Sequence, residues 1–196
     1  MTADELSNHR IPVRDGLYLS SIRRSDKSAL LKHLQSPEIH DNTLTIPYPY
    51  HEADADAWLQ LRLQHSQKVD REVTFAIRND NHEMIGTIGA DTLDPGTTNR
   101  AELGYWLATT YWGQRIMSDA LRVYINYAFS ELQLTKLVAH VFERNPASAG
   151  VLEHNGFQLE GRLREHYLKH GELLDARVYG LLKRDWLVHQ APDILS

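Results

Sequence analysis

The chain has 196 residues, of which 42% are hydrophobic, and this length suits one well-buried domain and is short for two independent ones. Its formal net charge of -5 leaves no broad basic surface for a polyphosphate backbone, so we expect no nucleic acid among its partners. The absence of cysteine excludes a disulfide framework, a thiolate nucleophile and a cysteine-based zinc site.

The N-terminal segment 1–16 is polar and has no apolar core of the kind found in signal peptides. No window approaches the ~18 consecutive apolar residues of a membrane span, so we expect a cytoplasmic protein with no membrane partner. In chain order, the first expected elements are a strand at 17–22, a helix at 25–36 capped by Ser25, a second helix around 57–63, and strands at 73–78, 84–90 and 101–108.

The second half of the chain continues this alternation of helix and strand patterns. A helix is expected to open at Gly113, because apolar residues then recur at intervals of three and four from Ile116 to Leu132. The later elements are a strand at 136–142, a helix capped by Asn145 and stopped at Asn155-Gly156, and two final strands around a turn at 169–173. Strands with helices interspersed predict a mixed sheet covered by helices.

The stretch TYWGQRIMSDAL, residues 110–121, places one glycine between the end of a strand and the start of a helix. The first amides of a helix lack intrahelical partners and its dipole makes that end electropositive, so phosphate is a natural guest. The stretch has neither the Lys-Ser/Thr ending of a nucleoside-triphosphate loop nor the three glycines of a dinucleotide fingerprint. An ordinary tight turn at Gly113 explains the same residues equally well.

Three ordered stretches resemble motifs of the GNAT superfamily of N-acetyltransferases, and more narrowly of its RimJ/RimL kind, the ribosomal-protein N-terminal acetyltransferases. IPYPYHEADADAWL is similar to their substrate-side entry segment, and ELGYWLATTYWGQRIMSDAL to their acetyl-coenzyme A strand and pyrophosphate helix. HVFERNPASAGVLEHNGFQLEGRLREHY resembles their second cofactor motif. The likeness covers roughly residues 13–184, so we treat 1–196 as a single acetyltransferase domain.

The resemblance implies an α+β fold with a central, splayed, mixed and mostly antiparallel sheet of about seven strands flanked by helices. It also implies acetyl-coenzyme A as cosubstrate, wedged between the strands at 101–108 and 136–142. The activity implied is acetyl transfer to a primary amine by direct attack in a ternary complex. The acceptor that the resemblance implies is a protein N-terminal α-amine or a small amine, and we expect a monomer or a homodimer.

The family's pyrophosphate motif, which is Gln or Arg, two residues, Gly, one residue, then Gly or Ala, falls on Trp112 to Met117. Arg115 occupies its central glycine position and Met117 its final small position, which removes steric room for a phosphate but keeps the amide donors. The cofactor-binding residues that the resemblance implies are Leu107, Thr109, Trp112, Gly113, Gln114, Arg115, Ile116, Met117, Ser118, Asn145 and Ser148.

Acetylation of an amine needs a proton acceptor and a proton for the departing thiolate. Glu102, on the strand expected to carry the thioester, is the candidate base, and its alternative role is an ordinary strand glutamate paired with Arg100 or Arg162. Some relatives use a tyrosine acid four residues before the Gly-Phe pair, where this chain has Leu152. Ser148 is the remaining hydroxyl near the sulfur, or else an ordinary serine of the helix surface.

Eleven histidines raise the question of a metal, but only His166 and His170 have ligand-like spacing. They lie around an expected strand end, where residues four apart are ~13 Å apart, so we expect no metal. A second function also stays open at this point. The chain could be a fold relative that binds acyl-coenzyme A as a sensor or assembly module without turnover.

Overall fold

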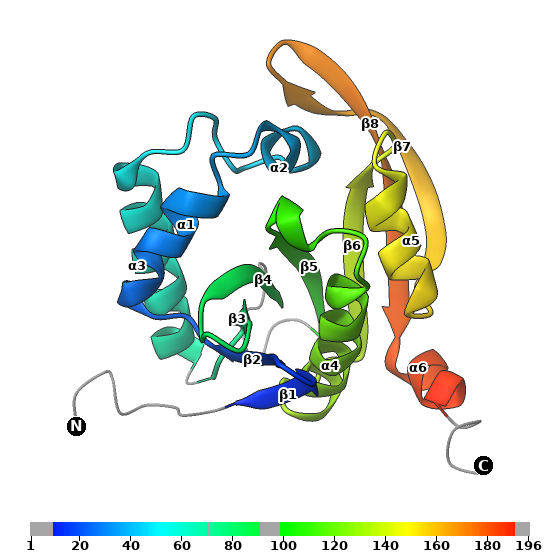
Figure 1. Cartoon of the computed structure of the whole chain (residues 1–196). Helices are drawn as coiled ribbons and strands as arrows, with labels where there is room; N and C mark the ends of the chain where they lie inside the picture. Colours follow the sequence, from blue (N-terminus) through cyan, green and yellow to red (C-terminus); the bar gives the residue numbers. More distant parts are fainter. Residues whose placement is uncertain (1–9, 70, 91–98, 191–196) are drawn as a thin grey trace. The chain divides into compact units, whose positions relative to one another are not determined.

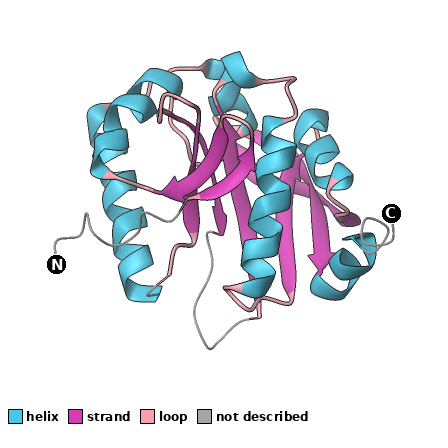
Figure 2. Cartoon of the chain, turned by 60° about the horizontal axis from the view of Figure 1, so that its bottom comes forward, coloured by secondary structure: helices cyan, strands magenta, loops and turns pink. Residues whose placement is uncertain are grey.

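The computed structural model describes residues 10–69, 71–90 and 99–190, and its mixture of helices and strands is plain in Figure 2. The α-helices are α1 (Lys27–His33), α2 (Pro37–Asn42), α3 (Glu52–Val69), α4 (Ile116–Ser130), α5 (Pro146–His154) and α6 (Lys183–Gln190), with 3-10 turns η1 (Arg24–Asp26) and η2 (Thr109–Tyr111). The strands are β1 (Ile11–Arg14), β2 (Leu17–Ser21), β3 (Thr74–Arg78), β4 (Met84–Ala90), β5 (Arg100–Leu107), β6 (Lys136–Phe142), β7 (Gln158–Lys169) and β8 (Glu172–Leu182). Of the helices in these ranges, none has the length and apolarity that crossing a membrane requires.

The strands hydrogen-bond in the order β1-β2-β3-β4-β5-β6-β8-β7. β5 and β6 run parallel, whereas the pairs β1-β2, β2-β3, β3-β4, β6-β8 and β7-β8 are antiparallel. The α+β class and the mixed, mostly antiparallel sheet are therefore confirmed. The eight described strands are one more than the sequence predicted.

The strand that the sequence pattern did not reveal is β1, which stands at one end of the strand order. It is only four residues long and contains Pro12. Proline has no amide hydrogen, so it is tolerated at the edge of a sheet and reads as a strand breaker elsewhere. Gly16, at a φ of +78°, turns the chain from β1 into β2.

The chain forms two compact units, the first made of Met1–Gly89 and Tyr105–Val123 and the second of Ala90–Gly104 and Tyr124–Ser196. In the first unit, α1 and α3 lie side by side (Figure 1). Their buried residues Leu30, Ala55 and Leu59 belong to one apolar cluster. Burying such faces is what makes short helices stable, because propensity alone is marginal at this length.

The N-terminal helices begin differently from their predicted positions. Ser25 lies inside η1 and does not cap a helix, because α1 begins two residues later, at Lys27. The carboxylate of Asp26 reaches back to accept the Arg23 amide at 2.7 Å, which tightens this first turn. Helix α2 is a further element that the sequence pattern does not predict, and it is capped by Ser36, whose hydroxyl accepts the Ile39 amide.

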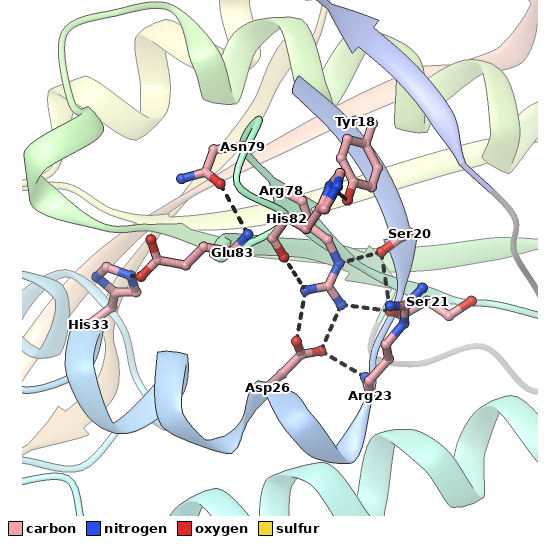
Figure 3. A network of polar contacts seen from close by, with 10 residues as sticks. All are labelled: Tyr18, Ser20, Ser21, Arg23, Asp26, His33, Arg78, Asn79, His82 and Glu83. Carbon is pink, nitrogen blue, oxygen red and sulfur yellow. Dashed lines mark hydrogen bonds and ion pairs between the residues drawn. The ribbon is translucent and has the colours of Figure 1, made fainter. Parts of the chain in front are cut away.

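A buried ion pair ties η1 to the strands of the first unit, as Figure 3 shows. Arg78 is 3% exposed and donates to both carboxylate oxygens of Asp26, at 2.8 and 2.9 Å. Its remaining donors reach the Ser20 hydroxyl at 2.6 Å, the Ser21 carbonyl at 3.2 Å and the His82 carbonyl at 3.3 Å. Because every donor finds an acceptor, the charge is tolerated away from water and fixes one arrangement of η1, β2 and β3.

In the second unit, β6 has β5 on one side and β8 on the other. The described ladder between β5 and β6 is short, with residues 100–102 opposite residues 136–138. By contrast, every residue of β6 pairs with β8. The predicted turn between the last two strands is confirmed, with His170 and Gly171 both at positive φ. In this unit, β5, β6 and β8 are therefore adjacent strands, and β7 pairs with the far side of β8.

Candidate functional site

The corner between β5 and α4 is built from consecutive residues of the first unit. The helix begins at Ile116 and not at Gly113, which corrects the expected start. Gly113 has a φ of +73° and Arg115 a φ of +59°, and the left-handed conformation cannot continue into a right-handed helix. Two left-handed residues thus turn the chain before the helix starts.

Side chains from two directions hold this corner. The Trp112 indole Nε1 donates to the Leu107 carbonyl at 2.8 Å, which closes the end of β5 on itself. Arg14, on β1, donates to the Gln114 carbonyl at 3.1 Å and to the Asp119 carboxylate at 2.8 Å. One guanidinium therefore bridges the turn and the first part of the helix, on either side of Arg115.

The start of α4 provides amide donors. Its first i to i−4 hydrogen bond is donated by the Asp119 amide to the Arg115 carbonyl, at 3.0 Å. The amides of Ile116 and Met117 precede that bond and so have no acceptor within the helix. The side chains of Ile116 and Met117 are buried, whereas that of Arg115 is exposed. This end of a 15-residue helix is electropositive and suited to an anion.

The other sequence-predicted cofactor residues of the first unit lie along the same stretch of chain. Leu107 is buried at the end of β5, and Thr109 opens η2, where its carbonyl accepts the Trp112 amide at 3.1 Å. Trp112 is 45% exposed, and Ser118 is buried in the first turn of α4. The main chain from β5 to α4 thus forms one continuous corner.

In the second unit, the candidate base Glu102 contacts an imidazole. Glu102 Oε1 lies 2.8 Å from His140 Nδ1. Glu102 stands opposite Val138 in the parallel register of β5 and β6, and side chains alternate along a strand, so Val138 and His140 share a face. The Glu102 side chain is 40% exposed and the His140 side chain is 21% exposed, so a molecule from solvent can reach both.

Two aromatic rings of β7, those of His166 and Tyr167, contact the ring of His140. Its ring lies nearly parallel to that of His166, with centroids 5.8 Å apart, and edge-on to Tyr167 at 6.4 Å. Tyr167 also packs edge-on against Phe142 at 5.7 Å. Burial raises the pKa of the Tyr167 phenol, and the negative charge of Glu102 raises it further. The phenol therefore stays protonated at neutral pH.

One alternative role of Glu102 does not occur. Arg162 does not pair with it, because its guanidinium binds Glu143 at 2.6 Å and Asp175 at 2.7 Å. The hydrogen bond that Arg162 donates to the Glu143 carboxylate is the main cause that raises the pKa of Arg162. The carboxylate of Glu102 is instead part of the pair with His140.

The residues expected near the pantetheine and the sulfur lie at the start of α5. Asn145 caps this helix as predicted, since its side-chain oxygen accepts the Ser148 amide at 3.0 Å. Ser148 itself is half-buried in the first turn. Leu152, at the position where some relatives have tyrosine, is fully buried and brings no hydroxyl. Asn145 and Ser148 are thus brought together, while their roles stay predictions.

The residue that sequence reasoning missed is His140. It lies 38 positions from Glu102, and only the parallel pairing of β5 with β6 brings the two side chains together. A signal was available, because His140 is the one polar residue between Leu137 and Phe142 in a predicted strand. A polar side chain among apolar neighbours on a strand is a reason to look for its partner.

Histidine and acidic side chains do not form a metal site in the part of the chain that the structure describes. There, no group of three or more histidine, aspartate or glutamate residues is arranged to hold an ion. His166 stacks on His140, and His170 lies at the turn of the last hairpin.

Residues 16–158 match a family model described as an acetyltransferase (GNAT) domain. The uncharacterised N-acetyltransferase p20 of Bacillus licheniformis is 36% identical over 110 residues, which are 56% of this chain and 61% of that protein. The ribosomal-protein-serine acetyltransferase of Escherichia coli is 34% identical over 97 residues, 50% of this chain and 54% of that protein. The chain therefore spans little more than half the length of these relatives.

Solved structures give a likeness that extends over most of the chain. RimL, a ribosomal-protein α-N-acetyltransferase solved in complex with coenzyme A, superposes with a TM-score of 0.80 at 23% sequence identity. The superposition covers 89% of this chain and 98% of that one. At this level of identity the likeness shows the fold.

Proposed function

Because this chain belongs to the GNAT family of acetyltransferases, we propose that it transfers the acetyl group of acetyl-coenzyme A to a primary amine. The family match over residues 16–158 is the observation that carries the proposal. Relatives that bear the name of N-acetyltransferase support it. The fold shared with a coenzyme A-bound acetyltransferase is consistent with the same cosubstrate.

The acceptor class follows from amine chemistry and from the relatives. The Escherichia coli relative acetylates serine of a ribosomal protein, and RimL acts on a protein α-amine. An α-amine has a pKa of about 7.7–8.0 against about 10.4 for lysine, so far more of it is neutral and nucleophilic near pH 7. We therefore propose a protein N-terminal α-amine as acceptor, with a small primary amine as the second choice.

We propose that the corner from β5 to α4 binds the pyrophosphate of coenzyme A. The amides of Ile116 and Met117 stand at an electropositive helix end, which suits a phosphate group. Arg115 adopts the left-handed conformation that glycine favours, so the backbone keeps the shape of the glycine it replaces. Its exposed guanidinium adds a positive charge beside those amides.

The reaction needs few groups from the protein. The neutral amine attacks the thioester carbonyl carbon, a C–N bond forms and the C–S bond breaks, and the sulfur leaves with the bonding electrons. Glu102 and His140 are available to take the proton that the nitrogen loses. A thiol has a pKa near 8.5, so the thiolate is a tolerable leaving group, and Ser148 is the candidate for any proton it receives.

The test is thiol release from acetyl-coenzyme A over a panel of amines. The panel contains peptides with N-terminal serine and alanine, the same peptides with a blocked N-terminus, a free amino acid and a polyamine. We expect thiol release with the free N-terminal peptides and none with the blocked ones, together with a product whose mass has increased by one acetyl group.

Two outcomes would contradict the proposal or its acceptor class. Coenzyme A binding by calorimetry without thiol release from any amine would indicate a sensor or assembly module. Thiol release with the polyamine and none with peptides would move the acceptor to small amines.

A further inference from the structure

We propose that His140 is the catalytic residue that accepts the proton of the acceptor amine, and that Glu102 is the positioning residue that orients it. The proposal rests on the acetyl transfer proposed above and names the group that carries its proton. Its basis is the contact between His140 Nδ1 and Glu102 Oε1, at 2.8 Å, on one face of two parallel strands.

This contact sets which imidazole nitrogen can act as a base. An ionised carboxylate only accepts hydrogen bonds, so the proton of a neutral His140 lies on Nδ1 and points at Glu102. The lone pair is then on Nε2. Among the described residues, no hydrogen bond uses His140 Nε2, since its remaining contacts are ring contacts with His166 and Tyr167. The nitrogen that can take a proton is therefore the uncommitted one.

The surroundings keep the imidazole in place. The ring of His166 covers it at an interplanar angle of 19°, and the Tyr167 ring meets it at 88°. The charged or titratable groups that face it are Glu102 from β5, and His166 and Tyr167 from β7, while β8 places Val178 opposite it. One carboxylate thus faces the ring, which favours the imidazolium that forms during the reaction.

The two side chains also differ in suitability as bases. A general base works best when its pKa is close to the operating pH. An imidazole nitrogen is inherently a stronger base than a carboxylate oxygen, so it is the better of the two groups to accept and hold the proton. The ordered carboxylate then has the role of fixing the tautomer and orientation, as in other carboxylate and imidazole pairs.

The proton balance of the step is closed. As the amine nitrogen bonds to the thioester carbon, it becomes positively charged and passes one proton to His140 Nε2. The C–S bond breaks, and the sulfur takes its electron pair and later one proton, which His140 returns through water or solvent supplies. The products are the amide and the free thiol, and His140 is neutral again.

The first experiment compares kcat at saturating acetyl-coenzyme A for His140→Gln, Glu102→Gln and the double variant. We expect His140→Gln to lower kcat by about 10²-fold and Glu102→Gln by about tenfold, with coenzyme A affinity within about twofold of the parent. The double variant should be no slower than His140→Gln, because the two residues act as a unit. The matched controls are His154→Gln, exposed at the end of α5, and Glu131→Gln, exposed in the turn after α4.

The pH dependence separates a proton acceptor from a structural residue. The defect of His140→Gln should shrink as pH rises from 6 to 10, because hydroxide in solvent then increasingly accepts the proton that the nitrogen loses as it bonds to the thioester carbon. A defect that is constant across pH 6 to 10 would assign His140 a structural role. A larger loss in Glu102→Gln than in His140→Gln would make Glu102 the base and overturn the assignment.

A second measurement does not depend on any variant folding. Nitrogen NMR of the intact protein labelled at histidine should show the neutral His140 ring with its proton on Nδ1, and the opposite tautomer would overturn the proposal. The two proposals fail separately. A parent protein that turns over an amine while His140→Gln stays within twofold of it refutes only this assignment, whereas a parent inactive on every amine refutes the acetyl transfer itself.

Discussion

A tight steric constraint on a single residue of the first unit lies at Gly86 on β4. A methyl group there would lie 2.5 Å from the Trp106 carbonyl oxygen and 3.1 Å from the Leu107 Cα, and backbone atoms cannot move aside cheaply. We expect Gly86→Ala to lower the free energy of unfolding by about 1–3 kcal/mol in denaturant titrations. Gly161→Ala is the control, because no heavy atom lies within 4 Å of its new methyl group. Equal stability of the two variants would contradict this prediction.

Arg115 is the second residue whose backbone makes a prediction. A non-glycine residue at a φ of +59° carries a cost of about 1–2 kcal/mol, and a glycine there regains it while losing about 0.4–1 kcal/mol through the unfolded chain. Arg115→Gly should therefore fold at least as stably as the parent.

The same variant tests what the guanidinium does. If it holds a phosphate, coenzyme A affinity falls severalfold in Arg115→Gly and its dependence on salt flattens, because one charge contact is lost. We expect this result in calorimetry at two salt concentrations. Arg24→Gln, which removes one exposed charge elsewhere, is the control and should leave affinity unchanged. Tighter binding in Arg115→Gly would instead show that steric room matters most.

At the scale of elements, β1 supports the start of α4 through one side chain. Arg14 binds both the Gln114 carbonyl and the Asp119 carboxylate, a bridge that lysine cannot reproduce. We expect Arg14→Lys and Arg14→Gln both to weaken coenzyme A binding by up to about tenfold, the value of a hydrogen bond or two. Their unfolding free energies should fall by less than about 1 kcal/mol, because the pair is partly exposed. Unchanged coenzyme A affinity in Arg14→Lys would contradict this prediction, because it would show that the charge of Arg14 is sufficient without the bridge.

Elements with strong local signals could be predicted from the sequence. The signal for β6 is its apolar run, and the signals for α5 are the Asn-Pro pair at its start and the Asn-Gly pair at its end. β1 and α2 could not, because four and six residues give no period to recognise. The start of α4 could not be predicted correctly, because Arg115 adopts a left-handed backbone conformation that an arginine in a sequence does not indicate.

At the scale of the whole molecule, what the sequence could not supply were contacts between distant residues. Glu102 was singled out through the family resemblance, but its partner depends on the register of two parallel strands. The buried pair of Asp26 and Arg78 joins residues 52 positions apart, and charged residues are expected at the surface unless paired. Local patterns predict elements, whereas a pair of polar side chains is visible only after the strands are aligned.

The two compact units are interleaved along the chain, and this affects how the protein can be made or divided. The chain passes from one unit to the other inside β4, between Gly89 and Ala90, then inside β5, between Gly104 and Tyr105, and again inside α4, between Val123 and Tyr124. Neither unit is therefore a continuous segment that a truncation could isolate. During synthesis, the first unit lacks its last part until Val123 has been added, long after Gly89. Because β5 and α4 each contain residues of both units, truncating the chain within either element removes residues from both units.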